Sequence, residues 1–221
     1  MSKQLAAWIS IAGAALTLAL LLALHVLSPE FSPAWRMVSE YGNGRYEWVL
    51  TSMFVVWGAS MLSLAYALAS NGRRVGLIAL CLAGIGAVGG GVFDINHDAG
   101  HSIAGFLGIL GLPLAALLLK SGPRWATHLP WITLVLFALS FAVMVASFLA
   151  VRGSLPSQVP QSVPAGVIAW VGWTNRLLVV AYCVWISAAA LTVARPSGAR
   201  RPQPGGHPDP GRVSSPRRLR A

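Results

Sequence analysis

The densest group of residues able to do chemistry is the segment Asp94-Ile-Asn-His97-Asp98-Ala-Gly-His101. Histidine and carboxylate side chains are zinc ligands, and His97 and His101 are spaced as two ligands on one helical face. The segment also joins two apolar runs, so the chain must reverse within it and the two histidines are expected to flank a turn. The sequence therefore leaves two interpretations open: a metal held by His97, His101 and Asp94, or a polar turn without metal.

A second polar group, Gly172-Trp-Thr-Asn175-Arg176, begins the last apolar run. Counting about 20 residues back from Arg195 places Arg176 at a membrane depth similar to that of Asp94. Ionisable residues at that depth usually pair, so we expect Asp94 and Arg176 to be in contact, with snorkelling of Arg176 to headgroups as the alternative. The loop near residue 40 is expected to face this cluster. The predicted ligand-binding residues are Glu40, Arg45, Asn175 and Arg176.

The elements that position these residues are membrane spans. Hydrophobic residues make up 56% of the 221 residues and charged residues 10%, whereas a soluble domain carries about 25% charged residues. This composition excludes an ordinary soluble enzyme, a disulfide scaffold and a wholly disordered chain. Six apolar segments each approach the ~20 residues that a transmembrane helix needs. We predict an all-α integral membrane six-helix bundle in one domain, residues 1–194, with spans at 5–26, 48–69, 75–93, 102–119, 129–151 and 167–194.

The basic residues predict the orientation of the bundle. Six spans place both termini on one side, and 12 of the 16 lysines and arginines fall on that side. Basic loops stay in the cytoplasm, so both termini are predicted to be inside and the polar cluster outside.

Residues 195–221 form a tail with seven arginines, six prolines and four glycines. This composition predicts a disordered cytoplasmic tail. The tail either attracts anionic lipids or only fixes topology. No aromatic residues interleave its arginines, so nucleic-acid binding is not expected.

Three stretches together resemble the uncharacterised bacterial membrane family called domain of unknown function 998. They are Ser39-Glu40-Tyr41-Gly42 with Arg45-Tyr46-Glu47-Trp48; Gly91-Val-Phe93-Asp94 with His101-Ser-Ile-Ala-Gly105; and Gly172-Trp-Thr-Asn-Arg176 with Trp185. The resemblance covers residues 5–194. It implies a multi-pass protein of the bacterial cytoplasmic (inner) membrane, with no established activity. It also implies that Glu40, Asp94, His101 and Arg176 form one outer-leaflet site.

Three functions are compatible with these residues. The first is a non-catalytic lipid-headgroup-binding, transport or envelope-sensing module, in which the charges hold the helices and recognise a headgroup. The second is a membrane-embedded hydrolase or transferase acting on a lipid headgroup, with His101 as general acid/base, Asp94 orienting it and a possible divalent metal as cofactor. The third is a haem protein ligated by His25 and His101. Paired charges suffice for the first function, while catalysis needs additional parts, so the first is favoured. The sequence defines no oligomeric state.

Overall fold

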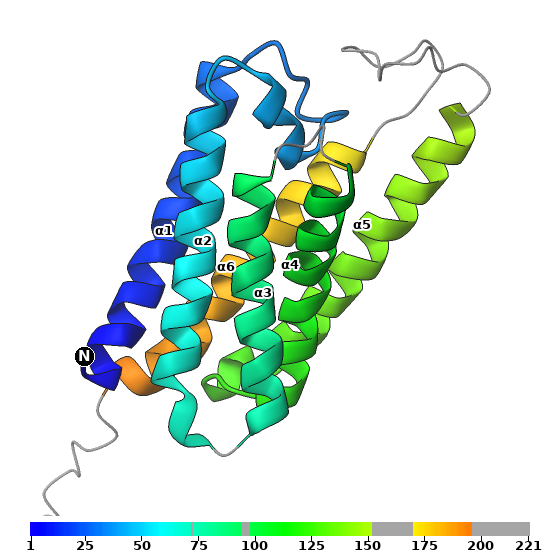
Figure 1. The fold of residues 1–221 in the computed structure, drawn as a ribbon. Helices are drawn as coiled ribbons and strands as arrows, with labels where there is room; N and C mark the ends of the chain where they lie inside the picture. The colour runs from blue at the N-terminus through cyan, green and yellow to red at the C-terminus, as the bar shows by residue number, and fades with distance from the viewer. Residues whose placement is uncertain (72, 94–97, 152–169, 196–221) are drawn as a thin grey trace, which may run out of the picture.

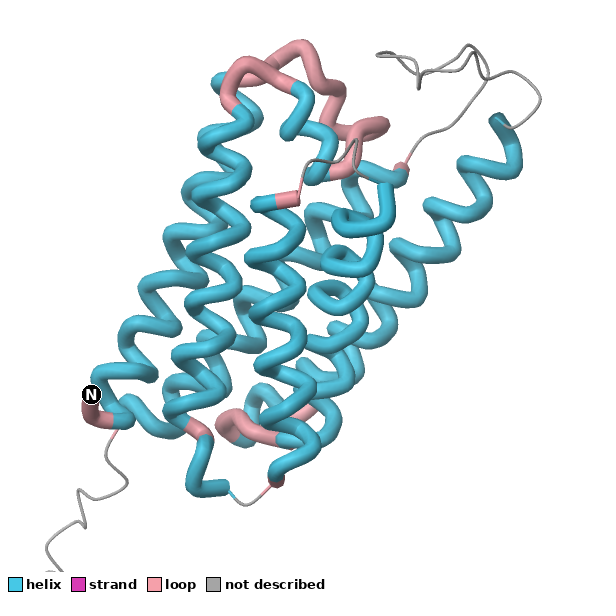
Figure 2. The backbone as a smooth tube through the Cα atoms, in the orientation of Figure 1, coloured by secondary structure: helices cyan, strands magenta, loops and turns pink. Residues whose placement is uncertain are grey.

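The computed structural model describes residues 1–71, 73–93, 98–151 and 170–195, and these form helices and connecting loops without strands (Figure 2). Each of the six long helices is apolar and long enough to cross a membrane. The chain is therefore an all-α, multi-pass membrane protein, as predicted. The long helices are α1 (Lys3–Leu27), α2 (Glu47–Ala67), α3 (Arg74–Val92), α4 (Asp98–Leu119), α5 (Leu129–Val151) and α6 (Val171–Ala194).

Three short 3₁₀ helices lie in the connections: η1 (Val38–Asn43), η2 (Ala69–Asn71) and η3 (Arg124–Ala126). The predicted spans agree with the long helices to within a few residues. Helix α2 ends at Ala67, whereas the predicted second span ends at residue 69, because η2 begins at Ala69. The beginning of the predicted sixth span, at residues 167–169, and the tail beyond Arg195 lie outside the described residues.

The six helices form one bundle in which α6 runs behind α2, α3 and α4, between α1 and α5 (Figure 1). Helices α1 to α4 pack in chain order, and α6 closes the bundle by packing against both α1 and α5. In their membrane-spanning windows, 61% of the residues of α6 are buried but only 11% of those of α5. Both the N-terminus and the last turn of α6 lie at one end of the bundle. We call the opposite end, where the α1–α2 loop covers the start of α6, the loop end.

The sequence contains a small-residue pattern, with Gly86 and Gly90 four residues apart and Gly100, Ala104 and Gly108 at every fourth position. Such a pattern predicts that neighbouring membrane helices approach closely. A methyl group at Gly86 of α3 would overlap the backbone nitrogen of Gly108 on α4 and lie 2.6 Å from the carbonyl oxygen of Ala104. A methyl group at Gly58 of α2 would lie 2.5 Å from the carbonyl oxygen of Gly84 on α3. Side chains larger than hydrogen at these crossings would force the helices apart.

A hydrogen bond from α6, in the middle of the bundle, replaces a backbone hydrogen bond that α4 lacks. Pro113 lies inside α4 and has no N–H, so the carbonyl of Ile109 loses its usual helical donor. The hydroxyl of Tyr182 on α6 donates to that carbonyl at 2.5 Å. Because Tyr182 is fully buried, the bond ties α4 to α6 where no water is available to replace it.

Candidate functional site

Arg176, near the start of α6, is the centre of a hydrogen-bond network at the loop end. Its side chain is 5% exposed. Its Nη1 donates to the carbonyl of Arg36 at 2.8 Å and to that of Gly172 at 2.9 Å, and its Nη2 donates to the hydroxyl of Tyr41 at 3.0 Å. Its Nε donates to Nε2 of His25 at 2.6 Å. One arginine thus joins α6 to α1 and to the α1–α2 loop.

His25 is fixed in one protonation form by this network. Its Nδ1–H donates to the carbonyl of Leu21 at 2.6 Å, while its Nε2 accepts from Arg176. An imidazole that donates at one nitrogen and accepts at the other is neutral. Axial ligation of haem by His25 would require one of these two hydrogen bonds to break.

Two further residues of the Gly172-Trp-Thr-Asn-Arg motif hold the α1–α2 loop. The N–H of Gly172 donates to the carbonyl of Ala34 at 2.9 Å, and the side-chain oxygen of Asn175 accepts from the N–H of Val38 at 3.0 Å. A methyl group at Gly172 would overlap the carbonyl oxygen of Pro33 and lie 2.6 Å from that of Arg36. The loop therefore packs directly on the backbone of α6, and only glycine permits it.

The carboxylate of Glu40 makes hydrogen bonds within the α1–α2 loop. One carboxylate oxygen accepts from Nη1 of Arg36 at 2.7 Å, and the other accepts from the N–H of Met37 at 2.6 Å. Both Arg36 and Glu40 are largely buried. A buried charge pair of this kind specifies a conformation because either partner alone would carry a large desolvation penalty.

His101 lies in the first turns of α4 and faces the loop end. Its Nδ1–H donates to the carbonyl of Phe93 at 3.1 Å, which leaves Nε2 as the ring atom that can meet a ligand. His101 lines two spaces. We call the first the loop-end pocket: it has a volume of about 400 Å³ and is bordered by Ser39, Glu47, Thr51 and Phe93 as well as His101.

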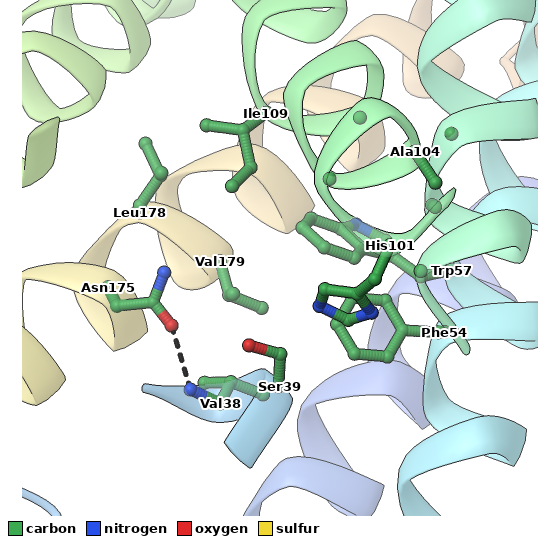
Figure 3. Close-up of a pocket in the computed structure, with 15 residues that line it drawn as sticks. Val38, Ser39, Phe54, Trp57, His101, Ala104, Ile109, Asn175, Leu178 and Val179 are labelled. Atoms are coloured by element: carbon green, nitrogen blue, oxygen red, sulfur yellow. Dashed lines mark hydrogen bonds between the residues drawn. The ribbon is translucent and has the colours of Figure 1, made fainter. Parts of the chain in front are cut away.

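The second space, which we call the inner cavity, has a volume of about 70 Å³ and extends into the bundle between α2, α3, α4 and α6. It shares Ser39, Gly90 and His101 with the loop-end pocket. Figure 3 shows Ser39, His101, Trp57 and Asn175 arranged around it. The remaining lining is mostly apolar, so a polar entrance leads to an apolar interior.

The structure separates the predicted site residues into two groups. His101 and Asn175 line the inner cavity, whereas Glu40 and Arg176 lie in the network that supports the α1–α2 loop. Arg45 is exposed, with its guanidinium 5.7 Å from the centre of the Tyr46 ring.

The remaining two predicted site residues, Asp94 and His97, lie outside the described residues. The Asp94–Arg176 contact thus stays a prediction. Among the residues the structure describes, no three His, Cys, Asp or Glu side chains cluster as metal ligands. The metal site also stays a prediction, since two of its three ligands are in the segment not described.

Sequence reasoning missed two important residues. The hydroxyl of Tyr41 accepts a hydrogen bond from Arg176, and the centre of the Tyr41 ring lies 5.5 Å from the guanidinium carbon, within cation–π range. Trp57 is 5% exposed and lines the inner cavity. Its position was a usable signal, because tryptophan in membrane proteins is enriched at the two interfaces and Trp57 lies well inside its span.

A six-span bundle with an inward-leading pocket at one end defines a multi-pass membrane protein with a ligand-sized site. A family model described as "Protein of unknown function (DUF998)" matches residues 11–192. The chain belongs to this family, as its motifs suggested. No curated protein and no solved structure matches the chain significantly.

Proposed function

We propose that the protein binds the headgroup of a membrane lipid in the loop-end pocket and is a binding, transport or sensing module rather than an enzyme. The observation that carries this proposal is that the two spaces adjoin one another. A pocket of about 400 Å³ with Ser39, Glu47 and His101 on its walls shares lining residues with an apolar cavity inside the bundle. Ligand sites occupy roughly 300–1,000 Å³, and a lipid is polar at one end and apolar at the other.

The charged residues of the site support a binding role over catalysis. Arg176 makes four hydrogen bonds to the protein itself, and Glu40 accepts from Arg36 and a backbone N–H. These contacts stabilise the loop that covers the pocket. The groups left to meet a ligand are largely neutral, with Glu47 as the charged side chain on the described wall of the pocket. Such a site suits a headgroup that carries hydroxyl or amine donors.

The distribution of basic residues supports an orientation with the loop end outside. Lys3, Arg73 and Lys120 belong to the terminal side, as do the arginines of the tail. By the positive-inside rule, the loop-end pocket then opens at the outer leaflet of the bacterial cytoplasmic membrane. The tail follows the end of α6, on the opposite side, and its seven arginines would attract anionic lipids of the inner leaflet.

Native mass spectrometry of protein extracted in mild detergent tests this proposal. Wild-type protein is expected to retain lipid, and the double variant Ser39→Ala/His101→Ala to lose most of it. The matched control is His128→Ala, since His128 is an exposed histidine directly before α5, and α5 begins at the other end of the bundle (Figure 1). Equal retention by the double variant, or no retained lipid in the wild type, would refute the proposal.

Hydrolysis of a lipid ester is a second candidate because Ser39 and His101 border the same two spaces. Serine beside a histidine whose other nitrogen is held by an acceptor is a nucleophile–base arrangement. A fluorophosphonate probe distinguishes the candidates. Labelling of Ser39 that disappears in His101→Ala favours an enzyme, whereas absence of labelling in protein that retains lipid favours the binding module.

A further inference from the structure

A third space adjoins the inner cavity on the side of α5. This lateral crevice, about 70 Å³ in volume, lies between α4, α5 and α6 and is bordered by Phe137, Ser140 and Phe141 of α5. It shares Ile109, Asn175 and Leu178 with the inner cavity. The three spaces therefore form a series that begins at the loop-end pocket and ends beside α5.

Helix α5, which borders the lateral crevice, has few buried residues. Its main contacts are with α6 and α4, and it leans away from the other helices toward the loop end (Figure 1). Most of its surface is turned to the surroundings, with 11% of its spanning window buried. The lateral crevice is thus at the edge of the bundle, where the hydrocarbon of a bilayer would lie.

Gly90 and Gly105 leave space in the inner cavity and do not bring helices together. A methyl group at Gly105 would meet no atom within 4 Å, and one at Gly90 would meet only the ring of Phe54, at 3.7 Å. Both glycines line the inner cavity. The contrast with Gly86, where a methyl group would collide with α4, shows that close packing does not account for glycine at positions 90 and 105.

The lining of the inner cavity and the lateral crevice suits a lipid chain that has an oxygen atom near its head. The inner cavity and the lateral crevice, at about 70 Å³ each, are below the roughly 150 Å³ of a cavity that accepts benzene, so they exclude a ring, and a chain that spans both requires their lining side chains to shift apart. Nε1 of Trp57, in the inner cavity, is buried without a hydrogen-bond partner among the described residues. Buried polar groups normally have partners, and an ester, ether or hydroxyl oxygen of a ligand would supply an acceptor.

We propose that one unbranched hydrocarbon chain of the bound lipid runs from the loop-end pocket through the inner cavity and leaves sideways between α5 and α6 into the bilayer. An oxygen near the head of the lipid accepts from Nε1 of Trp57. From His101 to Ile109 the path follows eight residues of α4, or about 12 Å at 1.5 Å per residue. This inference rests on the proposed function because the headgroup in the loop-end pocket anchors the chain.

Photo-crosslinking tests the path. The protein is reconstituted in vesicles of phosphatidylethanolamine and phosphatidylglycerol in which one acyl chain carries a diazirine, irradiated, digested and mapped by mass spectrometry. Carbene adducts are expected on Leu178 and Val179, which line the inner cavity. Gly105→Leu fills the cavity and should abolish these adducts, while adducts on lipid-facing Leu177, which is 53% exposed, should remain.

Two variants complete the experiment. Ala99→Leu adds bulk at an exposed position of the same helix and should leave the adducts unchanged. Gly105→Ala adds one methyl group in open space and should reduce the adducts without affecting folding. Persistence of interior adducts in Gly105→Leu, or wild-type adducts on exposed residues alone, would overturn the inference. If native mass spectrometry of the same samples still finds retained lipid, the headgroup proposal survives that result; if it finds none, both fail.

Discussion

The hydrogen bond between Tyr182 and the carbonyl of Ile109 provides a quantitative prediction about the scaffold. Replacing Tyr182 with phenylalanine removes the donor and leaves a buried carbonyl without a partner, because Pro113 cannot supply the helical N–H. An unsatisfied buried group costs about 1–3 kcal/mol, while hydrogen bonds inside membrane proteins average about 0.6 kcal/mol and reach about 1.7. The bond is short and fully enclosed, so we expect Tyr182→Phe to lower the free energy of unfolding by about 1.5 kcal/mol, near the upper end of the membrane range.

Pro113→Ala provides the decisive comparison. Alanine at this position restores an N–H that can reach the carbonyl of Ile109, so the tyrosine hydroxyl becomes partly redundant. In the Pro113→Ala background, Tyr182→Phe should therefore cost about 1 kcal/mol less than in the wild type. Unfolding by SDS titration in mixed micelles, followed by circular dichroism, measures all four proteins of this cycle. Strictly additive effects would refute the reasoning, because they would mean that the hydroxyl does not replace the missing backbone donor.

Three further predictions concern the loop end. Gly172→Ala places a methyl group against two loop carbonyls and should destabilise the protein by about 1–3 kcal/mol. It should also make the α1–α2 loop more sensitive to protease. An unchanged rate of proteolysis would count against the close contact. Arg176→Met should lower the free energy of unfolding by more than about 3 kcal/mol, since hydrogen bonds to charged groups are worth about 1.5–3 kcal/mol each. Arg176→Lys should recover only part of this loss, because an ammonium group cannot reproduce the planar guanidinium. SDS titration measures both variants, and full recovery by lysine would contradict the role of the guanidinium. In a background without the native cysteines, an impermeant maleimide should label Arg45→Cys in intact cells and the exposed Thr127→Cys only after lysis; the reverse pattern would invert the proposed orientation.

The spans were predictable from the sequence because hydropathy over 20 residues is a local property. All six helices were expected within a few residues of where they lie. The small-residue pattern also predicted close helix packing, which occurs at Gly86 and Gly108. It did not distinguish these glycines from Gly105, whose neighbouring space depends on where three other helices lie.

The partners that the structure describes for Arg176 were not predictable by matching opposite charges. The described network satisfies this arginine with a neutral histidine, a phenol hydroxyl and two backbone carbonyls. His25 and Tyr41 are more than 130 residues away in sequence, and a backbone carbonyl leaves no trace in the residue type. The pairing of Glu40 with Arg36 has the simple spacing of four residues, but the irregular loop around them gives no helical periodicity that would indicate it.

The position of His101 was predictable in part. Its position at the start of α4 follows from the sequence, and the structure adds that it borders both the loop-end pocket and the inner cavity. The adjacency of those spaces depends on residues from four helices and one loop, and no single motif encodes it. A lipid-binding interpretation therefore depends on the tertiary structure more than on any one residue.

A crystal structure of the protein grown in a lipid mesophase tests the central claim most directly. The account predicts continuous electron density for one lipid, with its headgroup beside Ser39 and His101 and a chain passing Trp57 and Gly105. A loop-end pocket and inner cavity that contain only water, or that are closed by the protein's own side chains, would contradict it.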